Sequence, residues 1–509
     1  MVFSSFPFIF SLLPLALLGF FVAARMGAKP AGLWLVLASL AFYAYWRVDF
    51  LPLLLISITF NYLIGDLLVR TRQRPGLQQA IFLLGIGADL AALFYYKYAA
   101  ALAAWLGLRT LAGMPLHDII LPLGISFFTF TQIGYLVDVK QEVAKTRDPL
   151  SYVLFVTFFP HLIAGPILHN REMMPQFADP TTYRFSISNI AVGLTIFAIG
   201  LAKKVLLADP LSADVAMNFG HTGELGLISA WYAVIGYSLQ LYFDFSGYSD
   251  MAIGLARMFN IRFPLNFNSP YKATTVIDYW QRFHMTLTRF ITMYIFSPMA
   301  LAVTRWRDRH GYDNGRKASS TPFGFLSLIA GPTLVTMGLA GIWHGAGTQY
   351  LIFGLLHGLY ISVNHATRTF FPAPKKPPPR PALVQTVDHA AKVLAVYVAA
   401  LVAFAFFRAP STGAALQVLA GMAGLHGLGS GLGLGTLAHL GVLFAIVWFA
   451  PNTQQIMNRY EPSLGRPVPN PYPTLSWNPR ASWAVAAGTV AALGVLALGG
   501  TTEFLYFQF

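Results

Sequence analysis

One histidine inside an apolar stretch has the clearest capacity for chemistry in this chain. His344 lies between Trp343 and Gly345, within an apolar run from Phe323 to Tyr360 that is typical of a membrane-embedded segment. An ionisable ring at bilayer depth is costly, and it usually lines a cavity or a pathway. Imidazole also exchanges a proton near neutral pH, as a general base must. His344 therefore indicates catalysis or a pathway rather than a passive membrane role.

A second histidine, His284, falls in Asp278–Arg289, which we predict to be one continuous helix. Thr275, three residues before Asp278, predicts a capping box at the start of this helix. Four side chains follow the spacing of one helix face, which predicts that the histidine points toward protein or the membrane interface rather than bulk water. They are Trp280, Phe283, His284 and Leu287.

A purely structural role remains open for both histidines, because polar contacts between membrane helices are common. Near His344, Gly341 and Gly345 would let a neighbouring helix or a ligand approach closely, and catalytic and structural interpretations are evenly balanced there. For His284 the residues alone favour the structural interpretation. His357 is predicted to be a packing or hydrogen-bonding residue. No two histidines have the spacing of a zinc site on one helix, and the chain has no cysteine, so we expect no metal site.

The composition is that of an integral membrane protein. Of 509 residues, 56% are hydrophobic and only 11% are charged, whereas soluble domains carry about 25% charged residues. The net charge of +14 could suggest nucleic acid as a partner. We exclude it because the basic residues, such as Arg70, Arg72 and Arg74, are confined to short loops between apolar spans, as the positive-inside rule describes.

The expected fold is an all-α, polytopic membrane bundle with about 10–12 spanning helices. Proline and glycine in 119–137 and 150–168 predict additional re-entrant or partial helices. The first apolar stretch, 3–24, is expected to be a retained span. We predict four regions along the chain: N-terminal spans (1–80), a catalytic core (81–370), a Pro/Lys-rich linker (371–386) and C-terminal spans (387–509).

Six motifs occur in order along the chain. They are Gly124–Asp138, Phe158–Pro166, Tyr242–Asp250, Asn266–Tyr271, Tyr279–His284 and Ile342–Gly345. Together they resemble the membrane-bound O-acyltransferase superfamily, specifically its bacterial branch that O-acetylates extracytoplasmic polysaccharides and includes alginate-type members. The resemblance runs from about residue 30 to the end of the sequence.

This resemblance implies a bundle with two funnels, one cytoplasmic and one external, that meet near His344. It implies that His344 is the catalytic histidine and that His284 is the second family histidine. Four further residues are candidates to line the tunnel: Trp343, Gly345, Trp280 and Asp244.

The function that we expect is O-acyl transfer by a multi-pass protein of the bacterial inner (cytoplasmic) membrane. Acetyl-CoA would be the cytoplasmic donor substrate, with no bound cofactor, and His344 would act as the base. The acetyl group would pass to a polysaccharide, directly or through a periplasmic esterase-like acetyltransferase partner, with membrane lipids around the protein. The alternatives are a transporter or channel without chemistry, and an acyltransferase that acts on a lipid or protein.

Overall fold

The computed structural model describes residues 1–111, 114–115, 119–144, 148–315, 317–372, 380–499 and 505, and these are predominantly helical. The predicted all-α class is confirmed. The described strands are one antiparallel pair, β1 (Thr110–Leu111) and β2 (Met114–Pro115). The chain forms two compact units: 1–206, 244–265 and 453–508 make unit 1, and 207–243 with 266–452 make unit 2. The four predicted regions remain predictions, and 373–379 of the linker lie outside the described residues.

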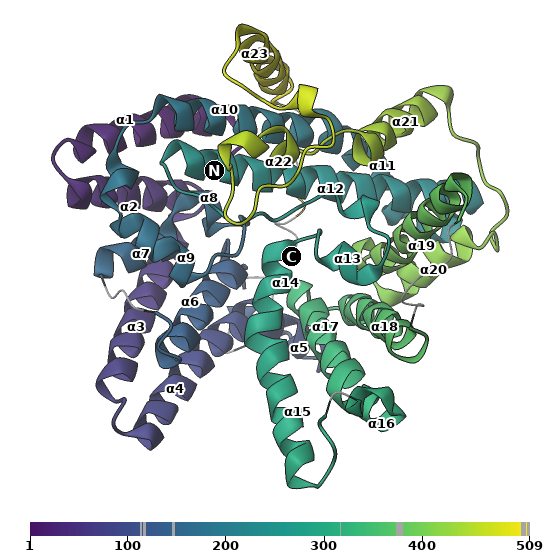
Figure 1. Cartoon of the computed structure of the whole chain (residues 1–509), viewed down its shortest axis with the longest axis horizontal. Helices are drawn as coiled ribbons and strands as arrows, with labels where there is room; N and C mark the ends of the chain where they lie inside the picture. Colours follow the sequence, from purple (N-terminus) through teal and green to yellow (C-terminus); the bar gives the residue numbers. More distant parts are fainter. Residues whose placement is uncertain are drawn as a thin grey trace. The chain divides into compact units, whose positions relative to one another are not determined.

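Unit 1 contains most of the first half of the chain and the C-terminal segment (Figure 1). Its α-helices are α1 (Leu13–Ala24), α2 (Ala28–Ala44), α3 (Leu51–Arg70), α4 (Pro75–Phe94), α5 (Ala100–Trp105), α6 (Ile125–Lys140), α7 (Pro149–Thr157), α8 (Phe159–Leu162), α9 (Asn170–Ala178), α10 (Ile187–Ala202), the second half of α12 (Leu227–Met258), α22 (Thr453–Ile456) and α23 (Ala481–Leu496). Short 3-10 or π-helical turns are η1 (Phe8–Leu12), η2 (Val48–Phe50), η3 (Tyr95–Ala99), η5 (Pro180–Tyr183), η6 (Lys203–Ala208), η13 (Asn458–Tyr460) and η14 (Pro473–Leu475).

Unit 2 contains both predicted site histidines. Its α-helices are α11 (Ser212–Gly220), the first half of α12, α13 (Val276–Trp280), α14 (Met285–Ile291), α15 (Ser297–Arg309), α16 (Pro322–Phe325), α17 (Gly331–His344), α18 (Thr348–Phe370), α19 (Ala382–Arg408), α20 (Thr412–Met422) and α21 (Leu434–Phe449). Its short turns are η7 (Asp209–Leu211), η8 (Thr222–Glu224), η9 (Pro270–Lys272), η10 (Thr292–Phe296), η11 (Ala318–Ser320) and η12 (Leu326–Ala330).

Six helical segments of the described chain are long and apolar enough to cross a membrane. They are Val48–Arg70, Pro75–Trp105, Ile187–Gly220, Met285–Arg309, Pro322–His344 and Ala382–Arg408. Five shorter apolar helices accompany them. Six is fewer than the predicted 10–12, and whether the shorter helices also cross remains a prediction.

The helix breaks expected from proline and glycine are present. α6 begins only after Gly124, whose positive φ of 71° leaves the preceding proline-containing segment outside the helix. α7 ends at Thr157, and Phe158 separates it from α8, which has Pro160 in its first turn. The proline ring favours an extended residue before it or a first-turn position, which explains the break.

In unit 1, glycines bring α10 and the second half of α12 into backbone contact. A Cβ on Gly193 would lie 2.5 Å from the carbonyl oxygen of Gly254, and a Cβ on Gly200 would lie 2.6 Å from that of Gly247. The reverse contacts are equally short. Paired small residues of this kind are the usual means by which membrane helices pack closely.

A similar contact joins α17 and α18 in unit 2. A Cβ on Gly341 would lie 3.0 Å from the Cα of Gly354 and would collide with the carbonyl oxygen of Tyr350. A Cβ on Gly354 would collide with the carbonyl oxygen of Met337. The close approach that we predicted at Gly341 is confirmed, and the partner is a neighbouring helix.

We predict that Gly354→Val destabilises the protein by about 1–3 kcal/mol or more, because the added methyl groups must push the two helix backbones apart. The matched control is Gly441→Val in α21, where a Cβ would meet nothing within 4 Å. It should change stability by less than about 0.5 kcal/mol. Thermal unfolding of both purified variants in the same detergent tests this. Equal unfolding temperatures would contradict the proposed packing constraint.

Candidate functional site

His344 is the last residue of α17 and is buried. The helix ends there because Gly345 is extended, with φ −175° and ψ 166°, and the chain then turns into α18. Three aromatic rings surround the imidazole, with ring centroids at 4.7 Å for Trp343, 4.9 Å for Phe407 and 6.0 Å for Phe353. The histidine is thus held among side chains of α17, α18 and α19.

Gly345 provides space for one of these supporting rings. A Cβ at this position would collide with the ring of Tyr350. Tyr350 in turn packs edge-on against Phe407, with ring centroids 5.7 Å apart. A side chain at Gly345 would therefore displace a ring that supports the wall around His344.

A second buried histidine lies one turn along α18 from Phe353. The rings of Phe353 and His357 are 4.8 Å apart. The indole Nε1 of Trp280 donates a hydrogen bond to Nδ1 of His357 at 3.2 Å. Because indole can only donate, Nδ1 is the acceptor, and the proton of the neutral ring is on Nε2. His357 is confirmed as a packing and hydrogen-bonding residue. Through Phe353 it links the wall around His344 to Trp280.

The predicted continuous helix over Asp278–Arg289 is wrong. α13 ends at Trp280 and α14 begins at Met285, while His284 between them has φ 45° and ψ 50°. The predicted N-terminus is confirmed, since Thr275 accepts a hydrogen bond from the backbone N–H of Asp278 at 3.1 Å.

Asn266 supplies the physical reason for the break. Its backbone carbonyl accepts from the N–H of Met285 at 2.9 Å. Its side-chain Oδ1 accepts from the N–H of Thr286 at 3.3 Å and from the hydroxyl of Thr286 at 2.8 Å. These long-range hydrogen bonds replace those that a continuous helix would make. Trp280, Phe283, His284 and Leu287, which we assigned to one helix face, are all buried. They are buried because the chain folds around this junction, and not because they share a face of one continuous helix.

The same amide determines which nitrogen of His284 carries the proton. Nδ1 lies 3.1 Å from Oδ1 of Asn266, and that oxygen is an acceptor because it also receives the N–H of Thr286. Nδ1 must therefore donate, which leaves Nε2 unprotonated in the neutral ring. Burial lowers the pKa of His284, which favours the neutral form.

We predict that Asn266→Ala destabilises the protein by about 1–3 kcal/mol, because buried donors at Thr286 and His284 lose their acceptor. Thr286→Val removes one of these hydrogen bonds and leaves the amide in place, so its loss should be smaller. Chemical or thermal unfolding of both variants measures the difference. A Thr286→Val loss equal to or larger than that of Asn266→Ala would show that the amide does not hold the junction.

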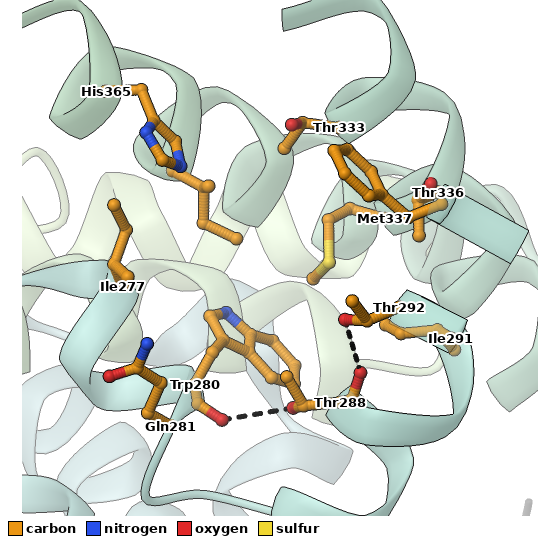
Figure 2. A pocket seen from close by; sticks show the side chains of 12 residues that line it. Ile277, Trp280, Gln281, Thr288, Ile291, Thr292, Thr333, Thr336, Met337 and His365 are labelled. Carbon is orange, nitrogen blue, oxygen red and sulfur yellow. Dashed lines mark hydrogen bonds between the residues drawn. The ribbon is translucent and has the colours of Figure 1, made fainter. Parts of the chain in front are cut away.

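Trp280 also lines a cavity of about 200 Å³ within unit 2, shown in Figure 2. Thr288 donates to the carbonyl of Trp280 at 3.0 Å, and Thr292 donates to the carbonyl of Thr288 at 2.7 Å, so two of the lining hydroxyls are satisfied. The described lining residues include neither His344 nor His284. Trp280 therefore faces a cavity, and the tunnel through the predicted site remains a prediction.

Asp244 belongs to unit 1 and has a clear structural role there. Its Oδ1 lies 2.7 Å from Nζ of Lys204, and the two side chains are 1% and 2% exposed. Its Oδ2 accepts from the backbone N–H of Leu505 at 3.3 Å. A neighbouring pair joins Lys203 to Asp250 at 2.6 Å. These pairs attach η6 to α12, and a tunnel-lining role for Asp244 remains a prediction.

We predict that Asp244→Asn destabilises the protein by about 3–5 kcal/mol, because it leaves the Lys204 ammonium buried without its counterion. The control is Asp388→Asn, which breaks the exposed Lys392–Asp388 pair and should leave the unfolding temperature unchanged. Differential scanning calorimetry compares the two. A wild-type unfolding temperature for Asp244→Asn would contradict a structural role for the pair.

The described site is thus a buried histidine at the end of an apolar helix, held by aromatic rings in a helical membrane protein. The model of the membrane-bound O-acyltransferase family matches residues 40–309. The chain is 39% identical over 459 residues to a peptidoglycan O-acetyltransferase of Helicobacter pylori, covering 84% of this chain and 81% of that protein.

Two further relatives come from other bacteria. A probable alginate O-acetylase of Pseudomonas aeruginosa is 37% identical, with 72% of this chain and 66% of that protein covered. A teichoic acid D-alanyltransferase of Bacillus subtilis is 28% identical over 49% of this chain and 60% of that protein. The chain belongs to the membrane-bound O-acyltransferase family. It is therefore a multi-pass membrane O-acyltransferase, as the resemblance implied.

Proposed function

We propose that this enzyme moves an acetyl group from cytoplasmic acetyl-CoA across the bacterial inner membrane for O-acetylation of an extracytoplasmic polysaccharide. The observation that carries this proposal is the enclosure of His344 by Trp343, Phe353 and Phe407 in a family of O-acyltransferases. Relatives described as acting on peptidoglycan and alginate favour a polysaccharide acceptor.

His344 acts as the general base in the proposed reaction. Its imidazole removes the proton from an acceptor hydroxyl, and the oxygen attacks the thioester carbonyl carbon. The new C–O bond forms as the C–S bond breaks, and the CoA thiolate leaves with the proton returned from the imidazolium. Aromatic walls around the ring exclude water and so favour transfer to the hydroxyl over hydrolysis.

His284 has a supporting role in this proposal. The Nε2 of its neutral ring can accept a hydrogen bond, which suits it to orient an acceptor hydroxyl. Trp343, Gly345 and Trp280, which all belong to unit 2, are proposed to line the path to the reacting groups. The acceptor hydroxyl belongs to the polysaccharide itself or to a periplasmic esterase-like acetyltransferase that then completes the transfer to the polymer.

We predict that His344→Ala lowers CoA release from acetyl-CoA by about 10²–10⁴-fold, the usual contribution of general acid–base catalysis. The assay uses proteoliposomes that contain the full chain, acetyl-CoA on one side and a soluble polysaccharide acceptor on the other. The control is His389→Ala, which removes an exposed histidine of α19 and should retain full turnover.

The outcomes separate the alternatives. Full CoA release by a folded His344→Ala variant would overturn the catalytic assignment. Acetyl or CoA movement without thioester cleavage by the wild type would indicate a transporter. Thioester cleavage with the acetyl group recovered on lipid or protein would replace the polysaccharide with that acceptor.

A further inference from the structure

A polar cavity of about 590 Å³ lies within unit 1, and its described lining includes neither His344 nor His284. Three of the residues that line it are arginines: Arg184, Arg257 and Arg262. The one acidic residue among the described lining is Asp179, whose carboxylate accepts from the N–H of Thr181 at 2.8 Å. The lining therefore has an excess of positive charge.

Arg257 is the buried member of these three arginines. Its side chain is buried, and one Nη donates to the carbonyl of Tyr460 at 3.3 Å. Its Nε has no hydrogen-bond partner among the described residues. Burial and the like charge of Arg262 lower the pKa of Arg257, while the carboxylate of Glu461 raises it. A buried guanidinium without a paired carboxylate is costly, and an anion would reduce that cost.

The carboxylate of Glu461, which interacts with Arg257, already forms an ion pair with another arginine of the lining. Glu461 pairs with Arg262 at 2.7 Å, and both side chains are partly exposed to solvent. Exposed pairs of this kind are weak and can exchange for a stronger anion. Arg184 is exposed and forms no described salt bridge. One exposed cation, one partly exposed cation and one buried cation thus line the same cavity.

The backbone that carries these arginines is held in place by side chains. Asn260, at φ 61°, donates to the carbonyls of Thr182 and Arg184 at 2.9 and 2.6 Å. Gln176 accepts from the N–H of Arg262 at 2.8 Å and donates to its carbonyl at 3.0 Å. The cavity is therefore organised before any ligand enters, which reduces the ordering cost of binding.

The position of the cavity along the chain indicates which kinds of anion could bind there. Ser186 and Asn189 also line the cavity, Ser186 as the N-cap of α10 and Asn189 in the first turn of that helix. α10 opens the segment Ile187–Gly220, which is long and apolar enough to cross a membrane. The cavity is therefore at the end of a candidate span, where headgroups and soluble ligands meet the protein, and the helix N-terminus adds positive potential.

We propose that this cavity is a binding site for a phosphate or diphosphate group. One guanidinium group can donate two parallel hydrogen bonds to two oxygens of a phosphate. Three arginines therefore suit a doubly charged phosphate group better than they suit a singly charged carboxylate ligand. The group can belong to a soluble phosphorylated ligand or to an anionic lipid. This site does not depend on the proposed acetyl transfer, because its evidence lies in the arginines and the cavity alone.

The test measures binding of inorganic pyrophosphate to the full chain in neutral detergent by isothermal titration calorimetry. We expect saturable binding that weakens as salt increases. Arg184→Gln combined with Arg262→Gln should weaken it by about tenfold or more, and these side chains are exposed enough for the variant to fold. Arg257→Gln should weaken it further. Arg466→Gln, which removes an exposed arginine outside the lining, is the control and should bind as wild type.

Competition identifies the source of the phosphate. If CoA displaces pyrophosphate, the natural ligand is a soluble phosphorylated molecule. If pyrophosphate binding is lost in nanodiscs of phosphatidylglycerol but kept in nanodiscs of phosphatidylcholine, the natural ligand is an anionic lipid. The proposal is overturned if pyrophosphate does not bind, or if the double variant binds it as tightly as wild type and Arg466→Gln. CoA release in the proteoliposome assay is scored separately, so failure here is distinct from failure of the acetyl transfer.

Discussion

The backbone contact between Gly341 and Gly354 is the constraint on which the histidine site depends. It lets α17 and α18 approach more closely than any side chain at either position would allow. Phe353, next to Gly354, is thereby brought against His344, three residues after Gly341. The ring is positioned by helix packing over several turns rather than by one local hydrogen bond. A site built in this way is rigid, which transfer between two bound substrates requires.

Unit 1 buries positive charge in two ways, one with a paired carboxylate and one without. The first has a structural explanation, and the second is the basis of the proposed binding site. Lys204 is fully buried, but Asp244 neutralises it at 2.7 Å. Arg257 is also buried, yet no described carboxylate pairs with it. Buried charges are usually paired. The paired lysine is explained by the attachment of η6 to α12, whereas the arginine without a paired carboxylate is explained by the proposed phosphate site.

Much of the fold could be predicted from the sequence, because composition and apolar spans determine the class of a membrane protein. The breaks at Gly124 and Phe158 were also predictable, since proline and glycine restrict the backbone locally. Which apolar stretches form helices long enough to cross a membrane was not predictable, because hydropathy does not fix the length of each helix. Six described segments reach the required length, and five apolar helices are shorter.

The errors at the site come from interactions between residues distant in sequence. The spacing from Trp280 to Leu287 is helical, and nothing within that segment reveals the junction at His284. The deciding hydrogen bonds come from Asn266, on the far side of a polar loop. The bond from Trp280 to His357 was equally hidden, because 77 positions separate them. A polar asparagine in a proline-broken stretch was the available signal, and its partner could not be identified without the fold.

The proposed role of His344 is tested most directly by an experimental structure of this chain with a non-hydrolysable thioester analogue of acetyl-CoA. We predict that the carbonyl carbon lies close to the His344 imidazole, with room between them for a hydroxyl whose oxygen is about 3–3.5 Å from that carbon. A bound analogue with its carbonyl far from His344, or an imidazole that faces lipid, would contradict it.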